Sequence, residues 1–247
     1  MGKTRVKKNK KISKITLLHY VKLFGRTALF LAVLFTYILK GTLLFTDYKM
    51  LPLFVWAVFV VEMFFRFFPS RLESPGCQKQ FERNYMPTGE GMPTNQPWWA
   101  TASVAFISVF VTAVVGALYL SGVIDAAVVI LITLFFSVCD IICILFFCPF
   151  QTWFMRNRCC TTCRIYNWDF AMMFSPLVFI PSVYTYSLFG FALLLLLRWE
   201  IGYRRHPEYF SVKTNAYISC QNCQEKLCHH KKQLRGFLKK YKDRFSK

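Results

Sequence analysis

Hydrophobic residues of this chain are gathered into long runs that short polar stretches separate. A helix needs about 20 mostly apolar residues to cross a hydrocarbon core about 30 Å thick. Runs of roughly that length cover residues 27–45, 51–68, 100–120 and 125–147. Short connections join the first run to the second and the third to the fourth. The pattern therefore predicts two transmembrane hairpins in an all-α polytopic membrane protein.

A fifth apolar stretch, residues 170–197, is interrupted by Pro176 and Pro181. Proline has no backbone N–H and breaks a helix. The breaks leave arms of about 11 and 16 residues, which are short for a crossing. We therefore expect four transmembrane helices plus a proline-broken re-entrant segment. The alternative is a fifth transmembrane segment that crosses once as a tilted, kinked helix.

Charge favours the re-entrant arrangement, because Lys and Arg are enriched in the cytoplasmic connections of membrane proteins. The chain has 31 Lys and Arg against 12 Asp and Glu, and the basic residues gather before residue 27 and after residue 197. A single crossing by the fifth stretch would put these two basic ends on opposite sides. We therefore expect a multi-pass protein of the cell membrane with a cytoplasmic N-terminus and a cytoplasmic tail.

The expected organisation follows from these patterns. The basic leader runs directly into a hydrophobic segment that has no small-residue cleavage site, so we expect it to be retained as a signal anchor. In chain order, we expect a basic cytoplasmic N-terminus (1–26), a transmembrane hairpin (27–68), a polar loop (69–99), a second transmembrane hairpin (100–148), a cysteine-bearing loop (149–169), the re-entrant or fifth transmembrane segment (170–197) and a basic tail with Cys and His (198–247).

Six of the ten cysteines lie in two clusters that flank the fifth stretch, and each cluster contains a C-x-x-C motif. Two intervening residues let both thiolates point at one ion, and two such motifs can complete a tetrahedral site. The chain is thus expected to bind Zn²⁺ or an iron–sulfur cluster, which thiolate spacing does not distinguish. The expected ligands are Cys160, Cys163, Cys220 and Cys223, with Cys159, Cys228 and His229 as further candidates.

Such a site indicates an electron-transfer, structural or binding role on the cytoplasmic face, and it requires both clusters on one side of the membrane. One alternative is a membrane thiol–disulfide oxidoreductase that uses Cys160 and Cys163, with the tail cysteines as an exchange pair. Another is that the clusters are reduced cytosolic thiols, palmitoylated near the membrane at Cys148, Cys159 and Cys160.

In outline, four transmembrane helices with cysteine pairs are similar to membrane thiol oxidoreductases of the vitamin K epoxide reductase type. Those enzymes have a C-x-x-C at a helix end beside a quinone, on the oxidising side of the membrane. Charge places Cys160 and Cys163 on the reducing side here. The resemblance therefore does not extend to membership of that family.

The expected spans contain Glu62, Arg66 and Asp140. A charge inside a span costs several kcal/mol and usually has a partner or a water-filled cavity. Glu62 and Arg66 are spaced i and i+4, so they can pair along one helix. Asp140 follows Cys139, which shares a helix face with Cys143; we expect both thiols to be packing residues. A small transporter that uses Glu62 and Asp140 is a further alternative, and a neutral, hydrogen-bonded Asp140 is the plain interpretation.

The basic tail also carries apolar residues at helical spacing, in residues 226–247, so we expect it to lie on anionic lipid headgroups. The sequence leaves open whether the chain has partner subunits in the membrane. Nucleic acid is not expected as a partner, because no base-reading motif accompanies the charge. Nucleotide-binding and hydrolase motifs are absent, so a conventional soluble-type active site is not expected. The sequence favours a role other than an enzyme and does not decide the question. No haem is expected, because every histidine lies outside the expected spans: His19, His206, His229 and His230.

Overall fold

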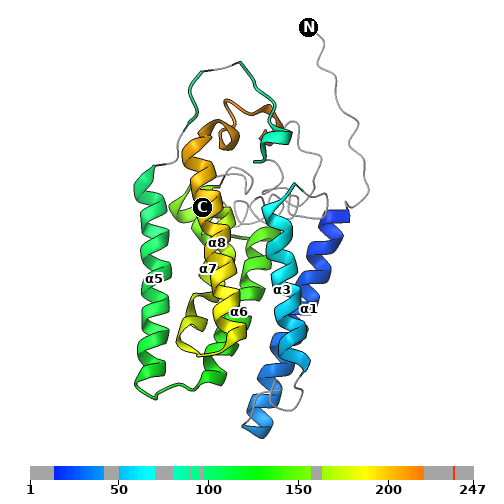
Figure 1. The fold of residues 1–247 in the computed structure, drawn as a ribbon, viewed down its shortest axis with the longest axis vertical. Helices are drawn as coiled ribbons and strands as arrows, with labels where there is room; N and C mark the ends of the chain where they lie inside the picture. Colours follow the sequence, from blue (N-terminus) through cyan, green and yellow to red (C-terminus); the bar gives the residue numbers. More distant parts are fainter. Residues whose placement is uncertain are drawn as a thin grey trace, which may run out of the picture.

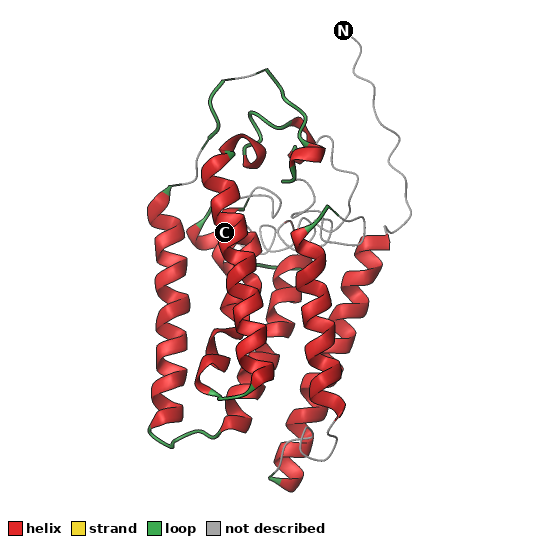
Figure 2. Ribbon diagram, viewed as in Figure 1, coloured by secondary structure: helices red, strands yellow, loops and turns green. Residues whose placement is uncertain are grey.

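The computed structural model describes residues 14–41, 50–69, 80–89, 91–94, 97–156, 163–219 and 236. Within these residues the regular structure is helical, apart from an isolated antiparallel bridge between Pro87 and Asn215. Five of the described helices are long and apolar enough to cross a membrane (Figures 1 and 2). The chain is therefore an all-α polytopic membrane protein, which confirms the predicted fold class.

The five long helices correspond to the five apolar stretches. Three of them begin and end within two residues of the predicted runs, because an uninterrupted apolar run leaves little choice about where a span begins. The helices are α1 (Lys14–Lys40), α3 (Met50–Phe67), α5 (Trp98–Leu120), α6 (Ala126–Leu145) and α8 (Val183–Arg205).

Helix α1 differs most from its predicted run, because it begins at Lys14 rather than at residue 27. Its first half carries polar side chains that other helices cover: Thr16, His19 and Arg26 are at most 7% exposed. His19 thus belongs to helix α1, and its Nδ1 lies 2.8 Å from the carbonyl oxygen of Ile15. Hydropathy alone hides these positions, because it scores a polar residue without regard to its partners.

Helices α1 and α6 pack in opposite directions. Arg26 of α1 contacts Asp140 near the end of α6, while Tyr37 near the end of α1 contacts Asp125 at the start of α6. Asp125 also caps α6, because its Oδ1 accepts a hydrogen bond from the Val128 N–H at 2.8 Å. This antiparallel pair brings the two predicted hairpins together.

The fifth apolar stretch folds as a broken arm followed by a long returning helix. The arm consists of α7 (Asp169–Phe174) and a 3-10 helix, η5 (Ser175–Phe179), and Pro181 lies in the turn before α8. At the usual rise per residue of an α-helix and a 3-10 helix, these two pieces together are about 19 Å long, which is less than the thickness of the hydrocarbon core. Its far end packs closely on α5, where the ring of Phe179 occupies the space that a Cβ on Gly116 would need.

Helix α8 differs from the predicted second arm. It has 23 residues and continues to Arg205, so it is long enough to cross a membrane. The helix does not stop at the charged Arg198, because the next residues find partners: Trp199 is 7% exposed and Glu200 forms an ion pair. The structure thus combines a proline-broken arm with a fifth long helix, instead of two short arms.

Both ends of the fifth stretch lie at the same end of the bundle (Figure 1). Arg164 precedes α7 and forms an ion pair with Glu200 near the end of α8, with 2.5 Å between Nη2 and Oε2. The indole N–H of Trp168 donates to the same carboxylate at 2.9 Å. The chain therefore leaves α8 at the end of the bundle from which it entered the broken arm.

Two segments, 80–89 and 206–219, cover this end of the bundle. Asn215 is fully buried; its amide oxygen accepts from the Met86 N–H at 3.3 Å and its amide nitrogen donates to the Tyr209 carbonyl at 3.0 Å. This cap joins the loop after α3 to the chain after α8. The shorter helical turns of the structure are η1 (Glu82–Asn84), η2 (Phe150–Phe154), η4 (Arg164–Trp168), η6 (Pro207–Phe210) and η7 (Ala216–Ile218).

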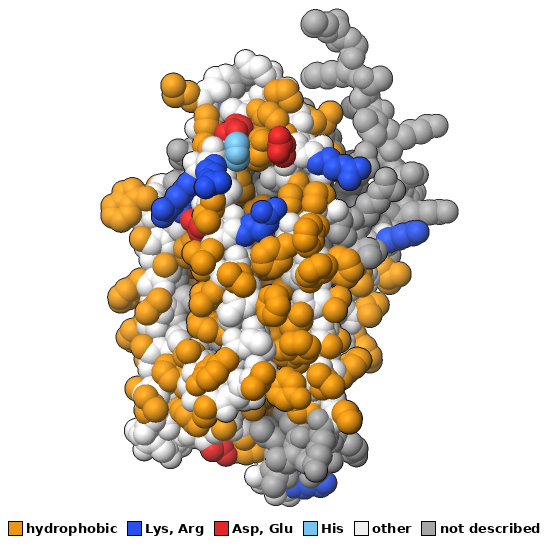
Figure 3. All heavy atoms as spheres, viewed as in Figure 1, with side chains coloured by type: hydrophobic (Ala, Val, Ile, Leu, Met, Phe, Trp, Pro, Cys, Tyr) orange, Lys and Arg blue, Asp and Glu red, His pale blue; other side chains and the backbone are white. Residues whose placement is uncertain are grey.

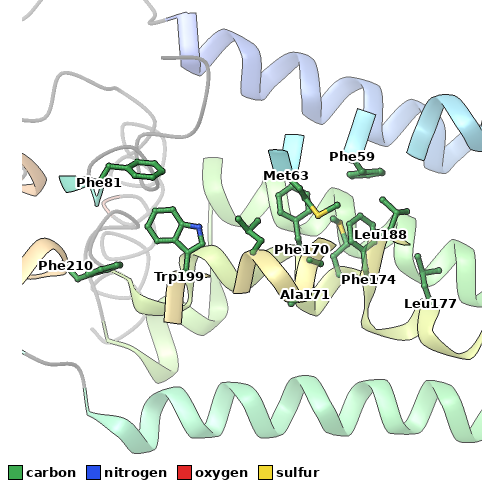
Figure 4. Packing of buried hydrophobic residues seen from close by; sticks show 13 residues of the cluster. Phe59, Met63, Phe81, Phe170, Ala171, Phe174, Leu177, Leu188, Trp199 and Phe210 are labelled. Atoms are coloured by element: carbon green, nitrogen blue, oxygen red, sulfur yellow. The ribbon is translucent and has the colours of Figure 1, made fainter. Parts of the chain in front are cut away.

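A core of buried aromatic and aliphatic side chains lies between α3, α7 and α8 (Figure 4). Phe59 and Met63 of α3 belong to it together with Phe170 and Phe174 of α7. The rings of Phe59 and Phe174 meet edge to face, with 5.2 Å between their centroids, which is a favoured aromatic geometry. This packing holds the broken arm inside the bundle.

The surface separates an apolar belt from a charged end. In Figure 3, hydrophobic side chains cover the middle of the molecule, and most described Lys and Arg gather near the capped end. Arg204 and Arg205 lie there at the end of α8, whereas Lys40 ends α1 at the opposite end. The capped end is termed the basic end. An apolar belt below a basic end is the arrangement that a bilayer favours.

Candidate functional site

The cysteines that the structure describes gather around one cleft inside the helical bundle. All four border this cleft, and two methionines add thioether sulfur to the same walls. The cleft has a volume of about 260 Å³ and mostly apolar walls. These sulfur-bearing residues and the space between them are termed the sulfur cleft: Cys139, Cys143, Cys148, Cys163, Met172 and Met173.

Helices α5 and α6, the broken arm and the connecting segments 148–151 and 163–166 line the sulfur cleft. Helix α6 contributes Cys139 and Cys143, which share one face because they are spaced i and i+4. Helix α5 contributes Ser108 and Thr112 on its own side of the cleft. The broken arm closes the cleft and is attached to α5 by a 2.6 Å hydrogen bond between the hydroxyls of Thr112 and Ser175. The thiols expected to be plain packing residues therefore border a space.

Two carboxylates also reach the sulfur cleft, and arginines neutralise both of them. Asp140 lies 3.2 Å from the Nη1 of Arg26, and Asp169 lies 2.6 Å from the Nη1 of Arg66. Both arginine side chains are less than a tenth exposed. The carboxylates thus bring polarity to the cleft without an unbalanced charge.

Arg26 ties three helices together. Its Nη2 lies 2.7 Å from Glu62 of α3, while its Nη1 contacts Asp140 and donates to the carbonyl of Ser137 on α6 at 2.9 Å. Lys22, one turn earlier on α1, lies 3.5 Å from Glu62. The two acids expected for transport do face one interior region, but Arg26 lies between them and engages both.

Arg66 forms a second buried ion pair, with the broken arm. Its Nη1 lies within 2.7 Å of both carboxylate oxygens of Asp169, and its guanidinium lies 4.4 Å from the centre of the Phe170 ring. The sequence suggested a Glu62–Arg66 pair along α3. In the ion pairs that the structure describes, Glu62 contacts Arg26 of α1 and Arg66 contacts the broken arm.

Most of the expected metal ligands lie outside the described residues, and Cys163 is the exception. Cys163 is 3% exposed and belongs to an apolar cluster with Val104 and Ile165, and its side chain borders the sulfur cleft. Among the residues that the structure describes, no three Cys, His, Asp or Glu side chains are placed to hold one metal ion. The ligands outside the described residues are Cys159, Cys160, Cys220, Cys223, Cys228 and His229.

Sequence reasoning missed Arg26 and the grouping of the thiols. Arg26 lies in the predicted basic N-terminus, and no local pattern marks it as a residue that other helices cover. The grouping of Cys163 with Cys139 and Cys148 had no local signal, because these residues belong to different elements that only packing brings together.

Comparison of this chain with known proteins identified no relative. No protein-family model matches this chain, and no significant similarity was found to a curated protein or to a solved structure.

Proposed function

We propose that this chain is an integral membrane thiol–disulfide oxidoreductase in which Cys160 and Cys163 are the exchanging pair. The observation that carries the proposal is the position of Cys163, which is 3% exposed and borders a cleft with three other cysteines. In a C-x-x-C pair the more accessible thiolate attacks, and the buried thiol resolves the mixed disulfide. Cys163 is the resolving thiol in this scheme.

The reaction is a two-step exchange. The Cys160 thiolate attacks one sulfur of a partner disulfide, forms a mixed disulfide and releases the other sulfur as a thiolate. The thiolate of Cys163 then attacks Cys160, forms the Cys160–Cys163 disulfide and releases the second partner sulfur. The partner gains two electrons and becomes a dithiol. Within the chain, the Cys220–Cys223 disulfide is the proposed partner.

The proposal needs the two cysteine segments at the same end of the bundle. The ion pair between Arg164 and Glu200 supports this, because Arg164 directly follows Cys163 and Glu200 lies near the end of the helix that leads to the tail. We also infer that this basic end faces the cytoplasm in the cell membrane, in agreement with its gathered Lys and Arg. Anionic lipid headgroups are the proposed partners of both basic termini.

Glutathione tests the exchange. The purified full chain in lipid nanodiscs is reduced, mixed with oxidised glutathione, quenched with acid and analysed by mass spectrometry. We expect Cys163→Ser to accumulate glutathione on Cys160 at least tenfold over the unsubstituted protein, because the resolving thiol is gone. Cys160→Ser should show no such adduct at residue 163.

Cys143→Ser is the matched control, because it removes a thiol of the cleft that lies outside the motif. It should behave like the unsubstituted protein. Equal adduct levels in all four proteins would contradict the proposal.

A thiolate site for Zn²⁺ or an iron–sulfur cluster, with an electron-transfer or structural role, is the second candidate. The Arg164–Glu200 ion pair favours it as well, because one site needs both C-x-x-C motifs on one side. Elemental analysis should then find stoichiometric zinc or iron that Cys220→Ser removes and Cys143→Ser keeps. An impermeant maleimide should also label residues 160 and 223 from the same face of sealed vesicles after metal removal. A metal-free protein, or labelling from opposite faces, would exclude this candidate.

A further inference from the structure

We infer that the sulfur cleft is a binding site for a small, uncharged aromatic molecule from the membrane phase. The inference rests on the proposed function only through Cys163, which borders the cleft and belongs to the exchanging pair. The site itself is defined by α5, α6 and the broken arm, and it does not require the exchange reaction.

The volume of the cleft sets the size of the ligand. A cavity of about 150 Å³ lined by apolar side chains is enough to hold benzene. The sulfur cleft, at about 260 Å³, has room for a molecule of about one to two rings by the same measure. It is also partly open to its surroundings, so a ligand can enter without unfolding the bundle.

The charge of the cleft excludes an ionic ligand. Asp140 and Asp169 border the space, and each is already in an ion pair with a buried arginine. A cation would find no unbalanced carboxylate among the described residues, and an anion would approach two carboxylates. Either ion would also lose its hydration without compensation. The ligand that fits these walls is uncharged.

The sulfur atoms select an aromatic ligand over an ion. Thiols and thioethers are polarisable, and sulfur makes favourable contacts with the edges of aromatic rings. Four cysteines and two methionines are distributed around the walls, and no three potential ligand side chains of the described residues converge as a metal ion requires. Sulfur spread over a surface suits a flat molecule, whereas sulfur gathered at a point would suit a metal.

Competition labelling tests the site. N-phenylmaleimide is the probe, because it is small, uncharged, aromatic and reactive toward thiols. N-phenylsuccinimide is its competitor, because it has nearly the same shape and lacks the reactive double bond. Labelling of Cys139 and Cys143 is followed by mass spectrometry on the full chain in nanodiscs. A reporter thiol, introduced as Ala113→Cys on the exposed side of α5, corrects for partitioning of both compounds into lipid.

We expect N-phenylsuccinimide to slow labelling of Cys139 and Cys143 at least fivefold, with saturation, and to leave the reporter unchanged. N-(4-carboxyphenyl)maleimide, which is charged, should label the cleft at least tenfold more slowly than the uncharged probe. Ser108→Phe should fill the cleft and remove the protection, while Ala113→Phe, on the exposed side of the same helix, should keep it. The competition needs no substitution in the cleft, so it remains decisive if Ser108→Phe does not fold.

Three outcomes would overturn the inference. Equal labelling by the charged and uncharged maleimides would show a water-filled cleft. Protection by n-decane and not by N-phenylsuccinimide would assign the cleft to a lipid acyl chain. Absence of protection by either compound would leave no binding site. Each readout is independent of the glutathione adduct on Cys160, so failure of the exchange reaction and failure of the binding site are distinguishable.

Discussion

Arg26→Met is expected to lower the free energy of unfolding by about 3 to 5 kcal/mol, the usual cost of removing one partner from a buried ion pair. Arg26 is 7% exposed and engages Glu62 at 2.7 Å and Asp140 at 3.2 Å. The substitution keeps most of the side-chain volume, but it leaves both carboxylates without their main cation inside the bundle. SDS titration of the protein in mixed micelles, followed by circular dichroism, measures the change.

Lys22→Met is the matched control for Arg26→Met. Lys22 lies on the same helix and reaches the same Glu62, but at 3.5 Å and with 16% of its side chain exposed. Its loss should cost less than about 1 kcal/mol, as partly solvated ion pairs usually do. Asp140→Asn, combined with Arg26→Met, should restore much of the stability, because Glu62 then keeps Lys22 as its cation and Asp140 no longer carries a charge. Equal losses for Arg26→Met and Lys22→Met would contradict the central role of Arg26.

Arg66→Met is expected to cost a similar amount, about 3 to 5 kcal/mol. Arg66 is 4% exposed, contacts both carboxylate oxygens of Asp169 within 2.7 Å and lies over the Phe170 ring. Its removal leaves Asp169 buried without a cation at the start of the broken arm. Limited proteolysis of the arm and the same SDS titration should both show the loss.

A double substitution separates charge from packing at this pair. Asp169→Asn combined with Arg66→Met removes both charges but keeps an oxygen that can accept from the Phe170 N–H, as Asp169 does at 2.9 Å. We expect it to recover at least half of the stability that Arg66→Met loses. Arg198→Met, which changes an exposed arginine on α8, should have almost no effect. Failure of the double substitution to recover would assign the effect to lost packing on Phe170.

Both arginines explain how the bundle holds polar residues among apolar helices. Lipid supplies little drive for helices to associate, so hydrogen bonds and ion pairs between helices carry more of the specificity. Arg26 selects the neighbours of α1, and Arg66 positions the broken arm against α3. The same two ion pairs neutralise the carboxylates that border the sulfur cleft, so the architecture and the chemistry of the cleft depend on the same contacts.

The location of the spans was predictable, whereas the neighbours of each span were not. The long apolar runs predicted α3, α5 and α6 within two residues. The start of α1 was not predicted, because Thr16, His19 and Arg26 are polar residues that neighbouring helices cover. A hydropathy pattern records the character of a residue, but it does not record whether that residue has a partner.

The candidate site was also predictable only in part. The C-x-x-C motifs are local, so the sequence predicted Cys160 and Cys163 as residues of interest. It could not predict that Cys163 would border a cleft with Cys139 and Cys143, because the two helix cysteines belong to α6 and Cys163 precedes the broken arm. The cleft exists because segments distant in the sequence pack around it.

The sequence by itself determined that this chain is a helical membrane protein with basic ends and a proline-broken fifth stretch. These properties follow from local composition, since the apolar thickness of the bilayer acts on each segment separately. Tertiary structure decided that α8 is one long helix, that both ends of the fifth stretch meet through Arg164 and Glu200, and that the thiols share one cleft. These features depend on which segments contact each other, and buried ion pairs and packing determine that only when the helices come together.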